Sequence, residues 1–227
     1  MRFLRRLIPG PLKRVLVRSV DLRAMLREDA RLRTKEIALR DEHVRNATLL
    51  PGTTALLERL PRGGVVAEIG VAEGDFSAAI LSVTAPTTLH LIDLWGSSVE
   101  RFGPSAHARV VTRFAADIRS GRVRIHRGLS WDMLATLEDR SLDWAYLDAA
   151  HDYESVSRDL AALLPKLRPD GLIVGDDYVM WAGQTGRYGV VEAVNELCLR
   201  EGFEFVHLAM QRHMHLKYAL RRIGAGR

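Results

Sequence analysis

Residues Val65–Ser77 read VVAEIGVAEGDFS, and this stretch decides which fold we expect. A short apolar run, Val65–Ala67, leads into a turn that carries Gly70 and Gly74. From Phe76 onward, apolar residues recur at the spacing of a helix. The order predicts a strand, a tight turn and a helix, which is the opening unit of a nucleotide-binding α/β fold.

The turn has the spacing E-x-G-x-x-x-G, from Glu68 to Gly74, and not the G-x-G-x-x-G of dinucleotide-binding folds. Acidic residues around it, Glu68, Glu73 and Asp75, would repel a pyrophosphate. A ligand with a cationic amino group and no phosphate, such as S-adenosylmethionine, fits better. Gly70 and Gly74 have no Cβ and would let the backbone approach that ligand closely. An α/β turn that merely needs glycines is the alternative.

Composition indicates one globular α/β domain with an appendage, since 47% of the 227 residues are hydrophobic and 27% are charged. The net charge is +5, and basic residues are dense in residues 1–40. A basic end suggests contact with an acidic partner, a membrane surface or RNA, and a solvated helix face is the interpretation that we favour. Cys198 is the only cysteine, which excludes an intrachain disulfide, and its apolar surroundings predict a core residue.

No apolar run approaches the roughly 20 residues that span a bilayer. The first residues are too broken by arginine and proline for a secretory signal, so we expect a cytoplasmic enzyme.

The chain divides near residue 60 in this interpretation. Residues 1–60 are expected to form an N-terminal helical extension, a lid or an oligomerisation arm, with residues 42–60 helical but broken near Pro51 and Gly52. Residues 61–227 are expected to form the catalytic domain, in which strands alternate with helices and so give a parallel sheet. The predicted strands are Val65–Ile69, Thr88–Ile92, Val123–His126, Leu142–Leu147, Leu172–Val174, Phe203–Met210 and Met214–Leu220. The last two leave no room for a crossover helix, which predicts a terminal antiparallel hairpin.

Acidic side chains follow several of these strands, at the edge where open α/β sheets bind ligands. Asp93 ends the second strand, Asp148 the fourth, and Asp176 and Asp177 follow the fifth. Neighbouring strands lie about 4.8 Å apart, so the last three acids should converge. Converging carboxylates repel one another unless a cation joins them, and oxygen ligands suit a hard ion such as Mg²⁺. The alternative is that one acid caps a helix and another faces solvent.

The glycine turn and the terminal hairpin resemble the class I S-adenosylmethionine-dependent methyltransferases. Two further segments, LDAAHDYE at Leu147–Glu154 and GDDY at Gly175–Tyr178, resemble the macrocin O-methyltransferase-like group of that class. This resemblance implies a Rossmann-like sheet of seven mostly parallel strands with a terminal antiparallel hairpin and helices on both faces. It also implies a divalent metal held by Asp148, Asp176 and Asp177. Ala149 departs from the usual glycine, and Ala150 stands where a candidate acidic base is common.

The same resemblance implies the cofactor contacts. Asp93 would bind the ribose, and Leu94 would flank the adenine, with Trp95 either beside it or packing a loop. Ser130, in the segment after the third strand, would contact the adenine. Asp148 is expected to border both the cofactor and the metal.

His151 is our candidate for the general base, because its ordinary pKa near 6.5 suits proton transfer close to neutrality. Alternatively, His151 orients an aspartate and takes no proton. Asp152 is the second candidate base. His213 and His215 are not expected to form a metal site, because partners at ligand spacing are missing. A glycine-rich loop with Trp181, Gln184, Arg187 and Tyr188 is placed to touch the acceptor.

The sequence therefore predicts a divalent-metal-assisted O-methyltransferase that acts on a hydroxyl of a small molecule, of sugar or natural-product type. RNA or protein methylation is the alternative, and the Asn/Asp-Pro-Pro-Tyr motif usual for N-methylation is absent after the fourth strand. A non-catalytic S-adenosylmethionine-binding protein is the third. We expect a homo-oligomer and no nucleic-acid partner.

Overall fold

The computed structural model describes residues 37–180, 186–211 and 215–225. All elements below lie in the compact unit that begins at Leu39. Most of the expected N-terminal extension, together with Trp181, Gln184 and His213, lies outside the described residues.

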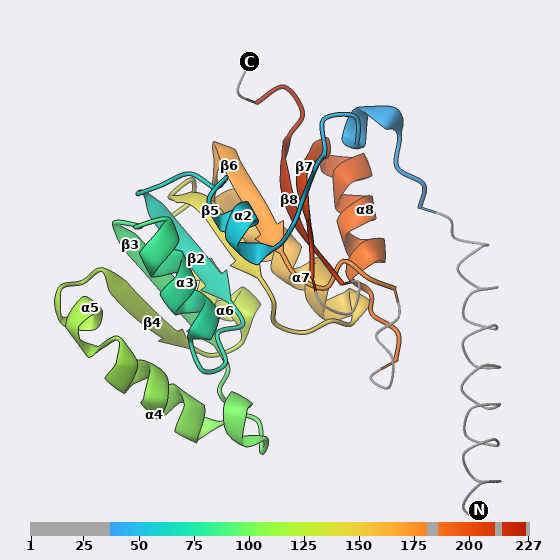
Figure 1. Ribbon diagram of the computed structural model, residues 1–227. Coiled ribbons are helices and arrows are strands. Elements are labelled where there is room, and N and C mark those ends of the chain that lie inside the picture. Colours follow the sequence, from blue (N-terminus) through green and yellow to red (C-terminus); the bar gives the residue numbers. More distant parts are fainter. Residues whose placement is uncertain (1–36, 181–185, 212–214, 226–227) are drawn as a thin grey trace, which may run out of the picture. The chain divides into compact units, whose positions relative to one another are not determined.

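One sheet of eight strands runs through this unit, in the spatial order β1-β7-β8-β6-β5-β2-β3-β4 (Figure 1). β8 is antiparallel to both of its neighbours, β6 and β7, and the other pairs are parallel. In chain order the strands are β1 (Thr48–Leu50), β2 (Val65–Ile69), β3 (Thr88–Asp93), β4 (Val123–Arg127), β5 (Leu142–Leu147), β6 (Leu167–Gly175), β7 (Phe203–Met210) and β8 (Leu216–Arg222). The parallel sheet with a terminal antiparallel hairpin is confirmed.

Helices cover both faces of the sheet, as expected. The α-helices are α2 (Thr53–Leu57), α3 (Asp75–Val83), α4 (Pro104–Arg113), α5 (Ala115–Arg119), α6 (Ser130–Ala135), α7 (Tyr153–Leu163) and α8 (Val190–Glu201). Short 3-10 helices are η2 (Asp41–His43), η3 (Glu100–Phe102) and η4 (Leu164–Lys166). α6, α7 and α8 pack on one face in a first apolar cluster, and α2, α3 and α4 pack on the other face in a second.

The alternation of side chains along β2 connects the two layers. Ala67 and Ile69 belong to the first cluster, and Val66 belongs to the second. Glu68 therefore points to the α3 side, because successive strand residues face opposite sides of the sheet. Cys198 on α8 is fully buried in the first cluster, which confirms its prediction as a core residue.

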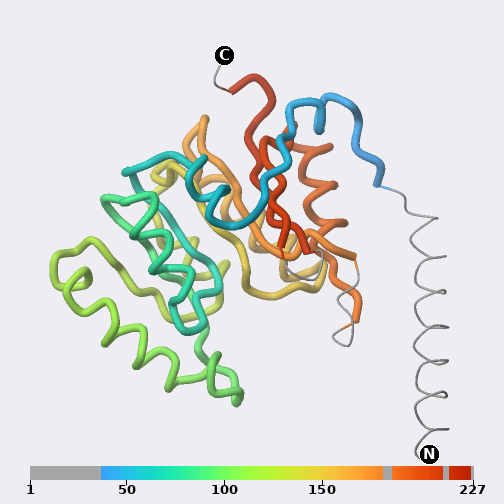
Figure 2. Tube along the Cα trace, in the orientation of Figure 1, coloured from blue at the N-terminus to red at the C-terminus, as the bar shows by residue number. Residues whose placement is uncertain are grey.

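The prediction of a helical segment over residues 42–60, broken near Pro51 and Gly52, is wrong before the break and is confirmed after it by α2. Thr48–Leu50 forms β1, which pairs in parallel with His207–Ala209 of β7 and adds an eighth strand at the sheet edge. Pro51 and Gly52 separate it from the one-and-a-half turns of α2. Figure 2 shows this blue segment beside the red strands from the end of the chain. Within the described residues, no helix has both the length and the apolar character needed to cross a membrane.

Candidate active site

A cavity of about 790 Å³ opens at the carboxyl ends of the central strands. Its lining includes Glu68, Gly70, Asp93, Leu94, Ser130, Asp148 and His151. Most of the residues predicted for cofactor and catalysis therefore meet in one place, and Gly74 is the predicted cofactor residue that is not among those lining the cavity.

The two glycines of the turn serve contacts within the protein. Gly70 has φ +91°, and a Cβ there would lie 1.9 Å from the carbonyl oxygen of Asp148. Gly74 has φ +80°, and a Cβ there would lie 2.8 Å from the ring of Phe114. The turn needs glycine because two neighbouring segments approach its backbone closely.

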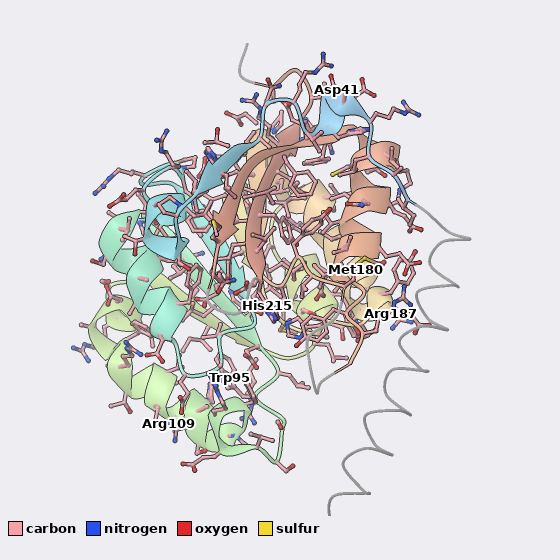
Figure 3. The ribbon with its side chains drawn as sticks, turned by 45° about the vertical axis from the view of Figure 1, so that its right-hand side comes forward. Asp41, Trp95, Arg109, Met180, Arg187 and His215 are labelled. Atoms are coloured by element: carbon pink, nitrogen blue, oxygen red, sulfur yellow. The ribbon has the colours of Figure 1, made fainter. Side chains whose placement is uncertain are left out.

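Two arginines of α4 pair with acids of the same turn. Arg109 contacts Glu73 at 2.7 Å, and Arg113 contacts Asp75 at 2.6 Å. Figure 3 shows Arg109 on its helix near Trp95. The ion pairs tether the turn to α4 and balance part of its negative charge.

Glu68 lines the cavity, and its side chain is buried, with 1% of the residue exposed. The Ser77 hydroxyl donates a hydrogen bond of 2.5 Å to its carboxyl group. Burial, with a smaller contribution from the charges of Asp148 and Asp93, raises the pKa of Glu68 to about 8. Glu68 is thus largely protonated at neutral pH and becomes a carboxylate when a cation approaches it.

Asp93 holds the two loops that frame the cavity. One carboxylate oxygen accepts the backbone N–H groups of Val71 and Ala72 at 2.8 and 2.9 Å, and the other accepts that of Trp95 at 2.7 Å. Each carboxylate oxygen has two lone pairs, so one acceptor position remains for a ribose hydroxyl.

The two residues after Asp93 differ in exposure. Trp95 is fully buried and donates its indole N–H to the Ala72 carbonyl at 2.9 Å, so it packs the loop. Leu94 is 51% exposed at the cavity. Of the two, Leu94 is therefore the one available to an adenine ring.

Ser130 lines the cavity, but its hydroxyl donates to Asp159 of α7. Asp159 is 1% exposed, and burial raises its pKa to about 6. The side chain of Ser130 thus joins α6 to α7.

Asp148, His151 and Asp177 form a cluster of potential metal ligands and proton acceptors at the edge of the cavity. Their donor atoms lie within 4.8 Å of one another. The Nε2 atom of His151 is 3.3 Å from Asp148 Oδ1 and 3.2 Å from Asp177 Oδ2. Burial alone would lower the pKa of His151, but its hydrogen bond with Asp148 and the nearby carboxylates outweigh burial and raise it. Burial raises the pKa of Asp148.

Residues around His151 hold its ring in place. Tyr188 stacks on the imidazole with ring centroids 4.5 Å apart and 7° between the planes. The backbone N–H of Gly189 donates to the His151 carbonyl at 2.7 Å. Tyr188 belongs to the loop that we expected at the acceptor.

His215 is a site residue that our sequence reasoning missed. Its Nδ1 lies 2.6 Å from Asp177 Oδ1, a contact that the sequence spacing did not indicate, and among the described residues His215 is not part of the group that could hold a metal. Figure 3 shows His215 at the strand ends near the middle of the molecule. Its place just before β8 carried no signal, because the contact spans 38 residues of sequence.

Asp176 and Asp152 lie apart from the cluster. Asp176 is paired with Lys217 of β8, a buried lysine that our sequence reasoning also missed. Lys217 is a lone charge in the apolar run Leu216–Leu220, which is the signal that could have identified it. Asp152 caps α7 by accepting the backbone N–H of Ser155 at 2.9 Å, and its side chain is exposed.

Comparison with known proteins gives a family for the central part of the chain. Residues 67–178 match the profile of a family described as a methyltransferase domain. The matched range contains the glycine turn, Asp93, the Asp148–His151 segment and Asp177. No curated protein sequence matches the chain.

Solved structures are similar in fold at low sequence identity. A SAM-dependent methyltransferase from Methanosarcina mazei has 13% identity and a TM-score of 0.56, over 77% of this chain and 99% of that one. An rRNA methylase from Streptococcus thermophilus has 14% identity and a TM-score of 0.53, over 74% and 92%. The pyocyanin biosynthetic protein PhzM has 17% identity and a TM-score of 0.51, over 71% and 51%.

These likenesses establish a Rossmann-like methyltransferase fold, and the family match covers the residues that line the cavity. Residues 67–178 therefore belong to a methyltransferase domain family, and the fold around them is the one that S-adenosylmethionine-dependent methyltransferases share.

Proposed function

We propose that this methyltransferase transfers the methyl group to a hydroxyl of a small molecule, with the help of a divalent cation. The observation that carries the proposal is the Asp148–His151–Asp177 cluster at the cavity edge, where an acceptor would meet the cofactor.

The residues present fit a hard divalent ion. Asp148 and Asp177 supply carboxylate oxygens, and their donor atoms lie within 4.8 Å of each other and of His151. Mg²⁺ commonly uses one or two carboxylates and keeps several waters. When bound, the ion would lower the pKa of the acceptor hydroxyl as a Lewis acid.

His151 is the residue that we propose to accept the proton. Its raised pKa comes from Asp148 and Asp177, which stabilise the imidazolium once the proton arrives. The acceptor oxygen forms a bond with the methyl carbon while the carbon–sulfur bond breaks, and the sulfonium becomes a neutral thioether. Tyr188 keeps the imidazole plane fixed for this transfer.

A cofactor site of the proposed kind needs negative charge for the methionine amino group and an apolar surface for the adenine. Glu68 supplies the first and Leu94 supplies the second, while Asp93 keeps one acceptor position for the ribose. The cavity of about 790 Å³ lies within the range of small-molecule sites, roughly 300–1,000 Å³.

A methyl-transfer assay tests the proposal. Purified protein is given S-adenosylmethionine and, separately, sugar-type hydroxyl acceptors, phenolic acceptors and RNA, each with Mg²⁺ and with EDTA. Methylation of a small hydroxylated acceptor that EDTA abolishes and Mg²⁺ restores supports the proposal. Methylation of RNA alone, or turnover unaffected by EDTA, refutes the acceptor class or the cation respectively. The N-terminal arm, the homo-oligomer and the cytoplasmic location stay predictions.

A further inference from the structure

Lys217 is a buried cation beneath the cavity. It is 4% exposed and lies on β8 next to Tyr218, which pairs with Gly175 of β6. Its ammonium donates to Asp176 and to the Tyr146 hydroxyl. It also lies 5.0 Å from the ring centroids of both Phe76 and Tyr146. Phe76 lines the cavity, so the ammonium sits just behind the cavity wall.

The carboxylate of Asp176 is fully engaged inside the protein. One oxygen accepts from Lys217 and from the Tyr146 hydroxyl, the latter at 2.9 Å. The other accepts from the Asp177 backbone N–H at 2.7 Å and from the Gln211 amide. A carboxylate offers about four lone-pair positions, and these donors occupy all of them.

The same contacts leave Asp177 pointing elsewhere. Asp177 has φ +53°, in the left-handed region, so its side chain diverges from that of Asp176 and reaches His151 and His215. Two consecutive aspartates thus have different partners: Asp176 contacts Lys217, and Asp177 contacts His151 and His215.

We infer that Lys217 determines the cation affinity of this active site, because it withdraws Asp176 from the ligands and places a fixed positive charge next to them. The divalent ion is left with the carboxylates of Asp148 and Asp177, beside His151. This inference concerns the ion of the proposed function, and it rests on that proposal only for the role of the ion in catalysis.

An ordinary buried ion pair is the competing explanation for Lys217 and Asp176. Such a pair changes the stability of the fold when one partner is removed, because the other charge is left buried alone. It has no effect on the affinity of a separate cluster for metal. Affinity therefore distinguishes the two explanations, and stability does not.

The experiment measures Mn²⁺ binding by electron paramagnetic resonance in the absence of S-adenosylmethionine and acceptor. The four proteins of a double-mutant cycle are the wild type, Lys217→Met, Asp176→Asn and the double variant. Asp177→Asn is the matched control, since the neighbouring aspartate undergoes the same isosteric change. Circular dichroism and thermal unfolding confirm that each variant is folded.

Lys217→Met is expected to bind Mn²⁺ at least about tenfold more tightly than the wild type, because a repelling charge is gone and a carboxylate is released. Asp176→Asn should bind no more tightly than the wild type, because it leaves the Lys217 charge unpaired, and the double variant should return to within about threefold of the wild type. Asp177→Asn should bind at least about tenfold more weakly.

Unchanged or weaker binding by folded Lys217→Met overturns the inference. If that variant does not fold, the double variant decides, because it lacks both charges: a tenfold loss relative to the wild type shows that Asp176 is already a ligand and overturns the inference, and a retained affinity supports it. Wild type that binds no Mn²⁺ while Lys217→Met does supports the inference and refutes the cation in the proposed function. Absence of binding in both proteins overturns the inference.

Discussion

Asp159 gives the sharpest prediction about stability, because it is a buried acid whose ionisation destabilises the folded protein. The side chain is 1% exposed, and its hydrogen-bond donor is the Ser130 hydroxyl. Burial raises its pKa from an ordinary 3.8 to about 6. In this part of the structure Asp159 Oδ2 is buried with no hydrogen-bond partner among the described residues, so ionisation is not compensated there.

The sign of the pH dependence follows from that shift. Between pH 3.8 and pH 6 the folded protein keeps a proton on Asp159 that the unfolded chain has lost, so stability falls as the pH rises. The shift of about two pKa units corresponds to roughly 3 kcal/mol in total, and about half of it falls between pH 5 and pH 8. Asp159→Asn cannot ionise and therefore lacks this loss.

Urea unfolding followed by circular dichroism measures the effect at pH 5, 6, 7 and 8. The free energy of unfolding of Asp159→Asn minus that of the wild type should increase by about 1–1.5 kcal/mol from pH 5 to pH 8, so the variant gains relative stability. Comparing the two proteins at each pH cancels the titration of every other group. Asp132→Asn, on an exposed side chain of α6, controls for the removal of a charge as such. A difference between variant and wild type that does not change with pH would refute the reasoning.

Three further outcomes are expected. His151→Ala should lower kcat by roughly 10²–10⁴ without a comparable change in the affinity for S-adenosylmethionine, and steady-state kinetics with near-normal kcat would exclude His151 as the proton acceptor. Wild-type affinity for S-adenosylmethionine should rise by up to about tenfold per pH unit toward pH 8, because Glu68, with a pKa of about 8, must ionise to attract the cation. Calorimetric titrations of Glu68→Gln should be flat over that range, and parallel profiles would contradict this. Gly70→Ala should cost several kcal/mol, since its Cβ would lie 1.9 Å from the Asp148 carbonyl, and a melting temperature within about 2 °C of the wild type would disprove the clash.

Local sequence determined the elements and the edge of the sheet that binds ligands. The stretch Val65–Ser77 specifies strand, turn and helix through its apolar spacing and its glycines, and these signals act within a few residues. Placing Asp93 and Asp148 at strand ends required only the strand boundaries. Alternating strands and helices with a closing hairpin were sufficient for the sheet class.

Short elements without a local signal could not be predicted in this way. Thr48–Leu50 becomes a strand only because the edge of β7 lies beside it, about 160 residues later in the chain. Three residues next to Pro51 carry no strand period of their own, and the tertiary environment decides their conformation.

The partners of the acids also came from tertiary structure alone. The sequence predicts that Asp148, Asp176 and Asp177 converge, but not that the antiparallel register of β6 and β8 brings Lys217 to Asp176 and His215 to Asp177. With a φ of +53° at Asp177, the two adjacent aspartates have different partners, Lys217 for Asp176 and two histidines for Asp177. Charge pairing at the site is decided by register and by one backbone dihedral, and neither is encoded in the residues on either side of Asp176 and Asp177.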